Sequence, residues 1–206
     1  MVLKRSHSKV GTSLSPGGQQ ITKKRSFYAE SSPSAAYYKV DWVWNSDSNV
    51  NVSNSQQWFT SFTPAQSWMQ SADGSVHPVQ GIGSVTLRLR MDKHDPTRVS
   101  TVILNEVLYV PSLPCNIIGP PLLQDYVVSL GWPYTIMSKE GEHLGIFNED
   151  PKFHLWLDGR DIGQSSLKEL GGYVTVGAHW PDEERVRWEE YKRHIVDTEP
   201  QGIAMP

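Results

Sequence analysis

The sequence has a single cysteine, Cys115, and no long apolar run. One cysteine excludes an internal disulfide and any cysteine-rich zinc site. No stretch approaches the roughly 18 consecutive apolar residues of a membrane span, and no apolar stretch near the N-terminus resembles a secretory signal. We therefore expect an intracellular protein, cytoplasmic or nuclear, that makes no membrane contact. Cys115 itself, between Pro114 and Asn116, is expected to be a small buried residue rather than a nucleophile.

Patterns for holding a metal or a cofactor are also missing. The histidines His77, His143, His154 and His179 are scattered, and none stands in an HxH or i, i+4 pair. The run 81–83 (Gly-Ile-Gly) lacks the third glycine and the following helix of a nucleotide-binding loop. We expect neither a metal nor a cofactor.

Positive charge is concentrated at one end of the chain. Six of the 19 basic residues and none of the 22 acidic residues fall within residues 1–29, so the rest of the chain is clearly acidic. An acidic body does not suit nucleic-acid binding, which needs a positive face. Only the basic N-terminal segment has the charge that nucleic-acid binding needs. Residues 1–36, rich in Ser, Gly, Gln and Lys, are predicted to be a flexible leader.

From Tyr37 onward the spacing of apolar residues is typical of short strands. Alternation predicts strands around 38–44, 82–89 and 99–110, with a hairpin turn at Asp73-Gly74. Further short strands are expected at 116–118, 134–137, 143–147 and 153–157, and a short helix at 121–130. Such closely spaced strands indicate one closed or sandwiched β domain, residues 37–175.

The C-terminal part has a helical pattern instead. Pro181 and the acids that follow it suit a helix start, and the basic residues 192–194 suit its end. Trp188, Tyr191 and Ile195 share one face. We predict an amphipathic helix at about 181–196, within a segment 180–197 that packs on the β domain.

The segment 42–53 reads WVWNSDSNVNVS. It resembles the aspartic protease of copia-type retrotransposons, a retropepsin-like domain whose motif is Trp, two apolar residues, Asp-Ser-Gly-Ala-Ser, one variable residue and His-Met-Thr. Aligned on Trp42, Asn45 takes the place of the catalytic Asp and Ser46 that of the Ser. Asp47 then takes the place of the Gly, and Asn51 that of the His.

Later blocks are similar to the same family, in order and at its spacing. Phe59 and Phe62 match its aromatics, and 72–74 with 78–85 match its hairpin and Gly-Ile-Gly strand. The blocks 107–111 (VLYVP) and 116–119 (NIIG) match its ending. The resemblance implies a mainly β fold: a closed retropepsin-like barrel with a short internal helix and a C-terminal helix. With one cysteine the chain lacks the zinc sites of a transposon polyprotein, so we expect a stand-alone, degenerate copy.

The substitution at Asn45 removes the chemistry that the resemblance implies. Aspartic proteases use two carboxylates that share a proton, one from each subunit of a retropepsin homodimer. An amide is neither basic enough to take a proton from water nor acidic enough to give one. A two-residue slip would make Asp47 the catalytic acid of an active homodimer, at the cost of the spacing from Trp42.

Eight tryptophans are many for a domain of this size, and an aromatic-lined pocket is one use for them. The candidate ligand-binding residues are Trp42, Trp44, Ser46, Trp58, Trp68, Trp132 and Trp156. The alternative is that most are core residues. Two functions stay open: a non-catalytic module that binds a peptide, a protein or a small apolar molecule, and a repurposed cofactor-independent cyclase, isomerase or lyase. In the second, Asn45, Asp47 or Asn51 would be the polar groups.

Overall fold

Short β-branched and aromatic runs, separated by Gly, Pro and Asn turns, form strands in the computed structural model. The structure describes residues 41–150, 152–158, 167 and 176–198, all of which lie in one unit, Ser31–Pro206. In chain order the strands are β1 (Trp42–Trp44), β2 (Val52–Ser53), β3 (Phe59–Ser71), β4 (Val76–Arg90), β5 (Val99–Tyr109), β6 (Asn116–Ile118), β7 (Tyr126–Ser129), β8 (Thr135–Ser138), β9 (His143–Asn148), β10 (His154–Leu155) and β11 (Ala178–His179). The helical elements are the 3₁₀ turns η3 (Gln56–Trp58) and η4 (Pro120–Gln124) and the helix α1 (Asp182–Thr198).

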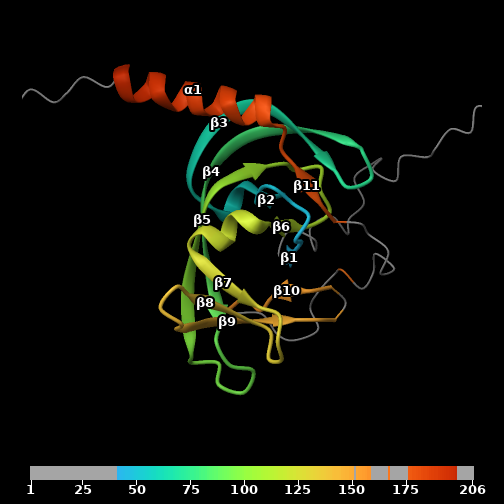
Figure 1. Ribbon diagram of the computed structural model, residues 1–206, viewed down its shortest axis with the longest axis vertical. Coiled ribbons are helices and arrows are strands. Elements are labelled where there is room, and N and C mark those ends of the chain that lie inside the picture. The colour runs from blue at the N-terminus through green and yellow to red at the C-terminus, as the bar shows by residue number, and fades with distance from the viewer. Residues whose placement is uncertain (1–40, 151, 159–166, 168–175, 199–206) are drawn as a thin grey trace, which may run out of the picture. The chain divides into compact units, whose positions relative to one another are not determined.

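Within the described residues the eleven strands make one sheet, in the order β11-β3-β4-β5-β2-β6-β1-β10-β9-β8-β7. The sheet curls into a half-barrel whose edge strands are β11 and β7 (Figure 1). A mainly β barrel-type domain with a short internal helical turn and one helix near its end confirms the predicted fold class.

Two long hairpins form most of the sheet. Between β3 and β4 the expected turn at Asp73-Gly74 is present, and Gly74 has a φ of +84°, which glycine adopts without steric cost. Between β4 and β5 the register shifts by one residue at Asn105 and Glu106. This bulge keeps Leu104 and Val107 on the same core although they are three positions apart.

The central strands β1 and β6 run parallel and separate two cores. Val43 and Ile117 pack into a first cluster with β2 and the ends of the β3–β4 hairpin. Trp42 and Ile118 pack into a second cluster with the C-terminal part of β4 and with β5. This alternation follows from the period of two in a strand. Because β6 pairs with both β1 and β2, it fixes both ends of the loop that connects these two strands.

One expected element has a different form. The helix predicted at 121–130 is only the short turn η4, and residues 126–129 continue as strand β7, which pairs with β8. Val127 and Val128 are β-branched and favour the extended chain, which outweighs the helical spacing of the apolar residues. The short strands expected around 134–137, 143–147 and 153–157 are confirmed as β8, β9 and β10. Residues 37–40 of the first predicted strand lie outside the described part.

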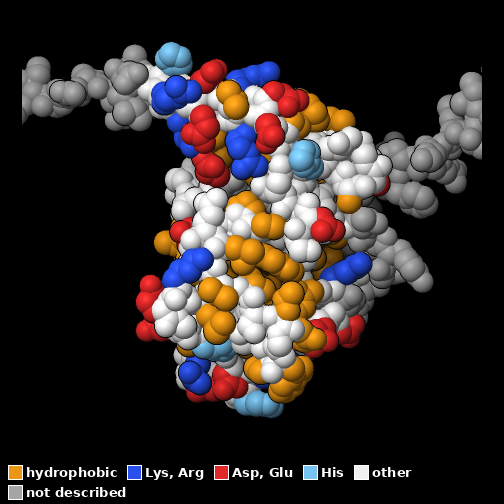
Figure 2. All heavy atoms as spheres, viewed as in Figure 1, with side chains coloured by type: hydrophobic (Ala, Val, Ile, Leu, Met, Phe, Trp, Pro, Cys, Tyr) orange, Lys and Arg blue, Asp and Glu red, His pale blue; other side chains and the backbone are white. Residues whose placement is uncertain are grey.

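The C-terminal helix is confirmed as α1 and lies across β3 (Figure 1). Its buried Glu184 accepts a hydrogen bond of 2.7 Å from the Ser67 hydroxyl of β3, and Trp188 packs against the first cluster. In the face of Figure 2, charged side chains of both signs gather over α1, whereas apolar side chains gather where η4 and β7 lie. No helix in the described ranges has the length and hydropathy that a membrane crossing requires.

Candidate functional site

The loop from Asn45 to Asn51 links β1 to β2 and contains the residues aligned with the protease motif. Asn45 follows β1, whose Trp44 N–H donates to the Phe153 carbonyl at 2.8 Å. The Asn45 N–H donates to the Ile118 carbonyl of β6 at 2.9 Å, so β6 holds the loop's first residue. These backbone hydrogen bonds fix the position of the chain where the loop begins.

Asn45 uses both ends of its side-chain amide for structural hydrogen bonds. Its Oδ1 accepts the backbone N–H of Asp47 at 2.8 Å and the hydroxyl of Ser48 at 3.2 Å, which makes an Asx-type turn. Its Nδ2 donates to the Val176 carbonyl. The side chain thus closes the turn and ties it to the segment before α1.

The same segment, Val176–Trp180, is bonded along the loop. The Ala178 N–H donates to the Ser48 hydroxyl at 2.9 Å. Asn49 donates from Nδ2 to the Trp180 carbonyl at 2.8 Å and accepts the Trp180 N–H at 2.7 Å. Four side-chain bonds therefore hold this segment on the loop.

The other candidate polar residues of the loop have separate environments. Asp47 is exposed, and its carboxylate accepts a long hydrogen bond of 3.4 Å from the exposed Ser46 hydroxyl. Asn51 is buried, and its Oδ1 accepts the Gly119 N–H at 2.9 Å. The structure brings Asn45, Ser46 and Asp47 into one turn, while Asn51 faces η4.

The candidate tryptophans are spread over the sheet. Trp42 is buried and meets Trp58 edge to face, with ring centroids 5.7 Å apart, and Trp44 and Trp58 pack on the second cluster. Trp68 is half-buried on β3, and Trp156 is buried under the Arg90 guanidinium. Trp132 is 81% exposed and lines a separate cavity with Tyr134 and His143.

A cavity of about 290 Å³ adjoins the loop beside Asn51. It is bordered by the loop, the β5 bulge, η4 and the start of α1. Its lining residues are Asn49, Val50, Asn51, Ile103, Leu104, Asn105, Glu106, Pro121, Leu122, Gln124, Asp125, Trp180 and Arg185. The volume is at the lower end of the range for small-molecule sites.

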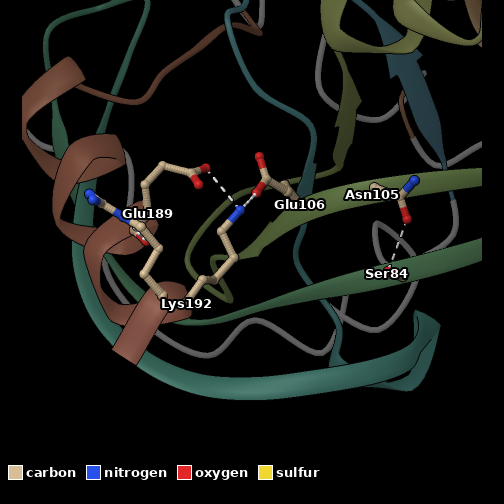
Figure 3. A network of polar contacts seen from close by, with 6 residues as sticks. Ser84, Asn105, Glu106, Glu189 and Lys192 are labelled. Carbon is tan, nitrogen blue, oxygen red and sulfur yellow. Dashed lines mark hydrogen bonds and ion pairs between the residues drawn. The ribbon is translucent and has the colours of Figure 1, made fainter. Parts of the chain in front are cut away.

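The bulge on the cavity wall is held by an ion-pair network. Glu106 has a φ of +52°, unusual for a residue other than glycine. Figure 3 shows Lys192 of α1 between Glu106 and Glu189, and Ser84 donating to the Asn105 side chain at 3.1 Å. Burial lowers the pKa of Lys192, but the hydrogen bonds to Glu106 and Glu189 outweigh it and leave that pKa above its ordinary value.

Cys115 and His77 are both buried side chains that belong to the interior of the domain. Cys115 is fully buried, as expected, and burial followed by the nearby Asp41 charge raises the pKa of its thiol to about 12. His77 is buried between the Ser71 and Ser112 hydroxyls, at 3.1 and 2.9 Å. The described residues contain no cluster of three potential metal ligands.

Sequence reasoning missed the residues that come to the site from far along the chain. Trp180 and Arg185 lie more than 120 residues after the loop, and no local pattern links them to it. Glu106 left a detectable signal: the alternation of apolar residues in β5 breaks between Leu104 and Val107, which is typical of a bulge.

The fold and the loop define a mainly β domain with a half-barrel sheet, in which the β1–β2 loop is held by the segment before α1. Residues 42–126 match the family model described as Pol polyprotein, beta-barrel domain. The match covers less than half of the chain and agrees with a transposon- or retrovirus-type Pol origin for this part. Neither the curated proteins nor the solved structures give a significant match.

Proposed function

We propose that this chain is a copia-type, transposon-derived protease domain that has lost peptide hydrolysis and serves as a binding module. The bound partner would be a peptide, a protein or a small molecule with apolar surface. The match of residues 42–126 to a Pol β-barrel domain supports the origin. The environment of residue 45 supports the loss of hydrolysis.

The observation that carries the proposal is the engagement of the Asn45 amide. Hydrolysis by the aspartic mechanism requires a carboxyl group at this position that can exchange a proton with water. The amide has no such proton, and its oxygen and nitrogen are bonded to the turn and to Val176. A group held in this way supports the loop instead of activating water.

The experiment is a cleavage assay of the purified full chain on a broad peptide library, from acidic to neutral pH. We expect no cleavage above background. An Asp47→Asn variant distinguishes the slipped alignment, because Asp47 is exposed and its substitution should leave the fold intact. Cleavage by the wild type that pepstatin-type inhibitors stop and that Asp47→Asn abolishes would overturn the proposal.

A further inference from the structure

The cavity beside Asn51 contains polar groups that the protein leaves unpaired. Asn51 is only 2% exposed, and its Oδ1 is bonded to the Gly119 N–H. Its Nδ2 has no hydrogen-bond partner among the described residues. Because Asn51 lines the cavity, this donor is open to an acceptor that enters it.

Arg185 brings an unneutralised positive charge to the same cavity. One terminal nitrogen donates to the Asn49 carbonyl at 2.9 Å, and the guanidinium lies over the Trp180 ring, 5.3 Å from its centroid. Its buried Nε has no hydrogen-bond partner, and no described carboxylate forms an ion pair with it. Arg185 is therefore held in place, but its Nε donor has no acceptor and its positive charge has no carboxylate partner among the described residues.

Neither acidic residue that lines the cavity, Glu106 or Asp125, forms an ion pair with Arg185, and the Asp125 side chain is exposed, so solvent screens its charge. Glu106 is engaged by Lys192, which also pairs with Glu189 (Figure 3). Apolar side chains supply part of the remaining wall: Ile103 is 48% exposed, while Val50, Leu104, Leu122 and Trp180 are buried behind it. The cavity thus combines a cation and an amide donor with a wall that is partly apolar.

We propose that this cavity binds a carboxylate attached to an apolar body, with the carboxylate oxygens accepting from Arg185 and from Nδ2 of Asn51. Hydrogen bonds between charged partners are stronger than those between neutral groups, and the planar guanidinium can donate two parallel hydrogen bonds to a planar carboxylate. The apolar wall takes the body of the ligand. This inference names the ligand class of the proposed binding module and rests on that proposal.

Two sources supply this chemistry, a free small carboxylic acid and the C-terminal carboxylate of a peptide. Calorimetric titration of the full chain with 4-phenylbutyrate and with its primary amide tests the first. A short apolar peptide with a free C-terminus and the same peptide with a C-terminal amide test the second. In at least one pair we expect the acid to bind about tenfold or more tightly than its amide. Equal affinity within both pairs, or no binding in either, would overturn the inference.

Variants assign the binding to this cavity. Asn51→Asp keeps the oxygen that accepts from Gly119 but replaces the donor by an anion, and Arg185→Gln removes the charge. Both should weaken binding of the acid about tenfold or more. Arg193→Gln makes the same charge change on the exposed side of α1 and should leave the affinity unchanged.

Thermal unfolding of each variant shows whether the fold is kept. If Asn51→Asp unfolds, Arg185→Gln against Arg193→Gln decides the question, and equal affinity of these two variants counts against the cavity. The two proposals can fail separately. A chain that cleaves no peptide but does not discriminate acids from amides would reject the ligand class while leaving the loss of proteolysis in place.

Discussion

At the scale of single residues, Asn45, which the resemblance to copia-type proteases aligns with the catalytic Asp, has its amide bonded to the scaffold. The resemblance identifies the position, and the chemistry of an amide predicts that peptide hydrolysis fails there. The hydrogen bond to Val176 could not be predicted, because that residue lies 131 positions away along the chain. The resemblance therefore singled out the position, and the tertiary contacts show which hydrogen bonds its side chain makes.

The structural role of Asn45 predicts the effect of restoring the acid. In Asn45→Asp, a carboxylate oxygen replaces the donor that faces the Val176 carbonyl, which leaves two acceptors opposed and should cost about 1–3 kcal/mol of unfolding free energy. Acidification should reduce this cost, because the protonated acid can donate again. Chemical denaturation at neutral and acidic pH measures both effects.

The matched control is Asn105→Asp. Asn105 is exposed, and within the described part of the chain its Oδ1 accepts only the Ser84 hydroxyl, which a carboxylate also does. We expect it to change the free energy of unfolding by no more than about 0.5 kcal/mol. Equal destabilisation by the two substitutions would contradict the scaffold role of Asn45.

At the scale of elements, strands were predictable where apolar residues alternate, and the least predictable features lie where that alternation breaks. The ranges expected for β5, β6, β8 and β9 were close to those observed, whereas β4 begins at Val76, six residues before the expected start. The long strand β3 was not predicted. Its residues alternate poorly because a register shift between Pro64 and Ser67 interrupts the pattern. The prediction of a helix at 121–130 was wrong. The apolar residues of this short segment have helical spacing, but its β-branched part forms the edge strand β7.

The β3–β4 hairpin depends on Gly83, which the sequence offered only as part of a Gly-Ile-Gly match. A Cβ added at Gly83 would lie 2.0 Å from the Ser61 carbonyl oxygen of the neighbouring strand. This atom is backbone and cannot turn away. We expect Gly83→Ala to destabilise the domain by about 1–3 kcal/mol, as overpacking does in general, and to lower the melting temperature.

Gly131→Ala serves as the control, because an added Cβ there meets only the Ser129 hydroxyl, at 3.8 Å. Its melting temperature should stay close to that of the wild type. A stable Gly83→Ala variant would show that the two strands can separate without cost, which contradicts the close approach at this position.

At the scale of the whole described domain, the buried His77 and the partly buried His143 link stability to pH. Burial is the main cause that lowers the pKa of His77, against the nearby Asp73 charge. Burial also lowers the pKa of His143, and the Arg98 charge adds to it. In both cases the folded protein favours the neutral ring, so the unfolded chain binds more protons in the window below the ordinary pKa of 6.5.

Stability should therefore be fully present above pH 6.5 and decrease as the pH falls from there towards the lowered pKa values of the folded state. Denaturant midpoints at about pH 7.5 and about pH 5.5 measure this decrease. The double variant His77→Gln/His143→Gln should show a smaller difference between the two midpoints than the wild type. The exposed His94→Gln variant should keep the wild-type difference.

The two histidines lie in different parts of the domain: His77 is next to the β3–β4 turn, and His143 is paired with β8. If the domain loses its structure in a single transition as the pH falls, both cores unfold as one cooperative unit. Separate transitions at low pH would instead mean that the long strands β4 and β5, which serve both cores, do not couple them.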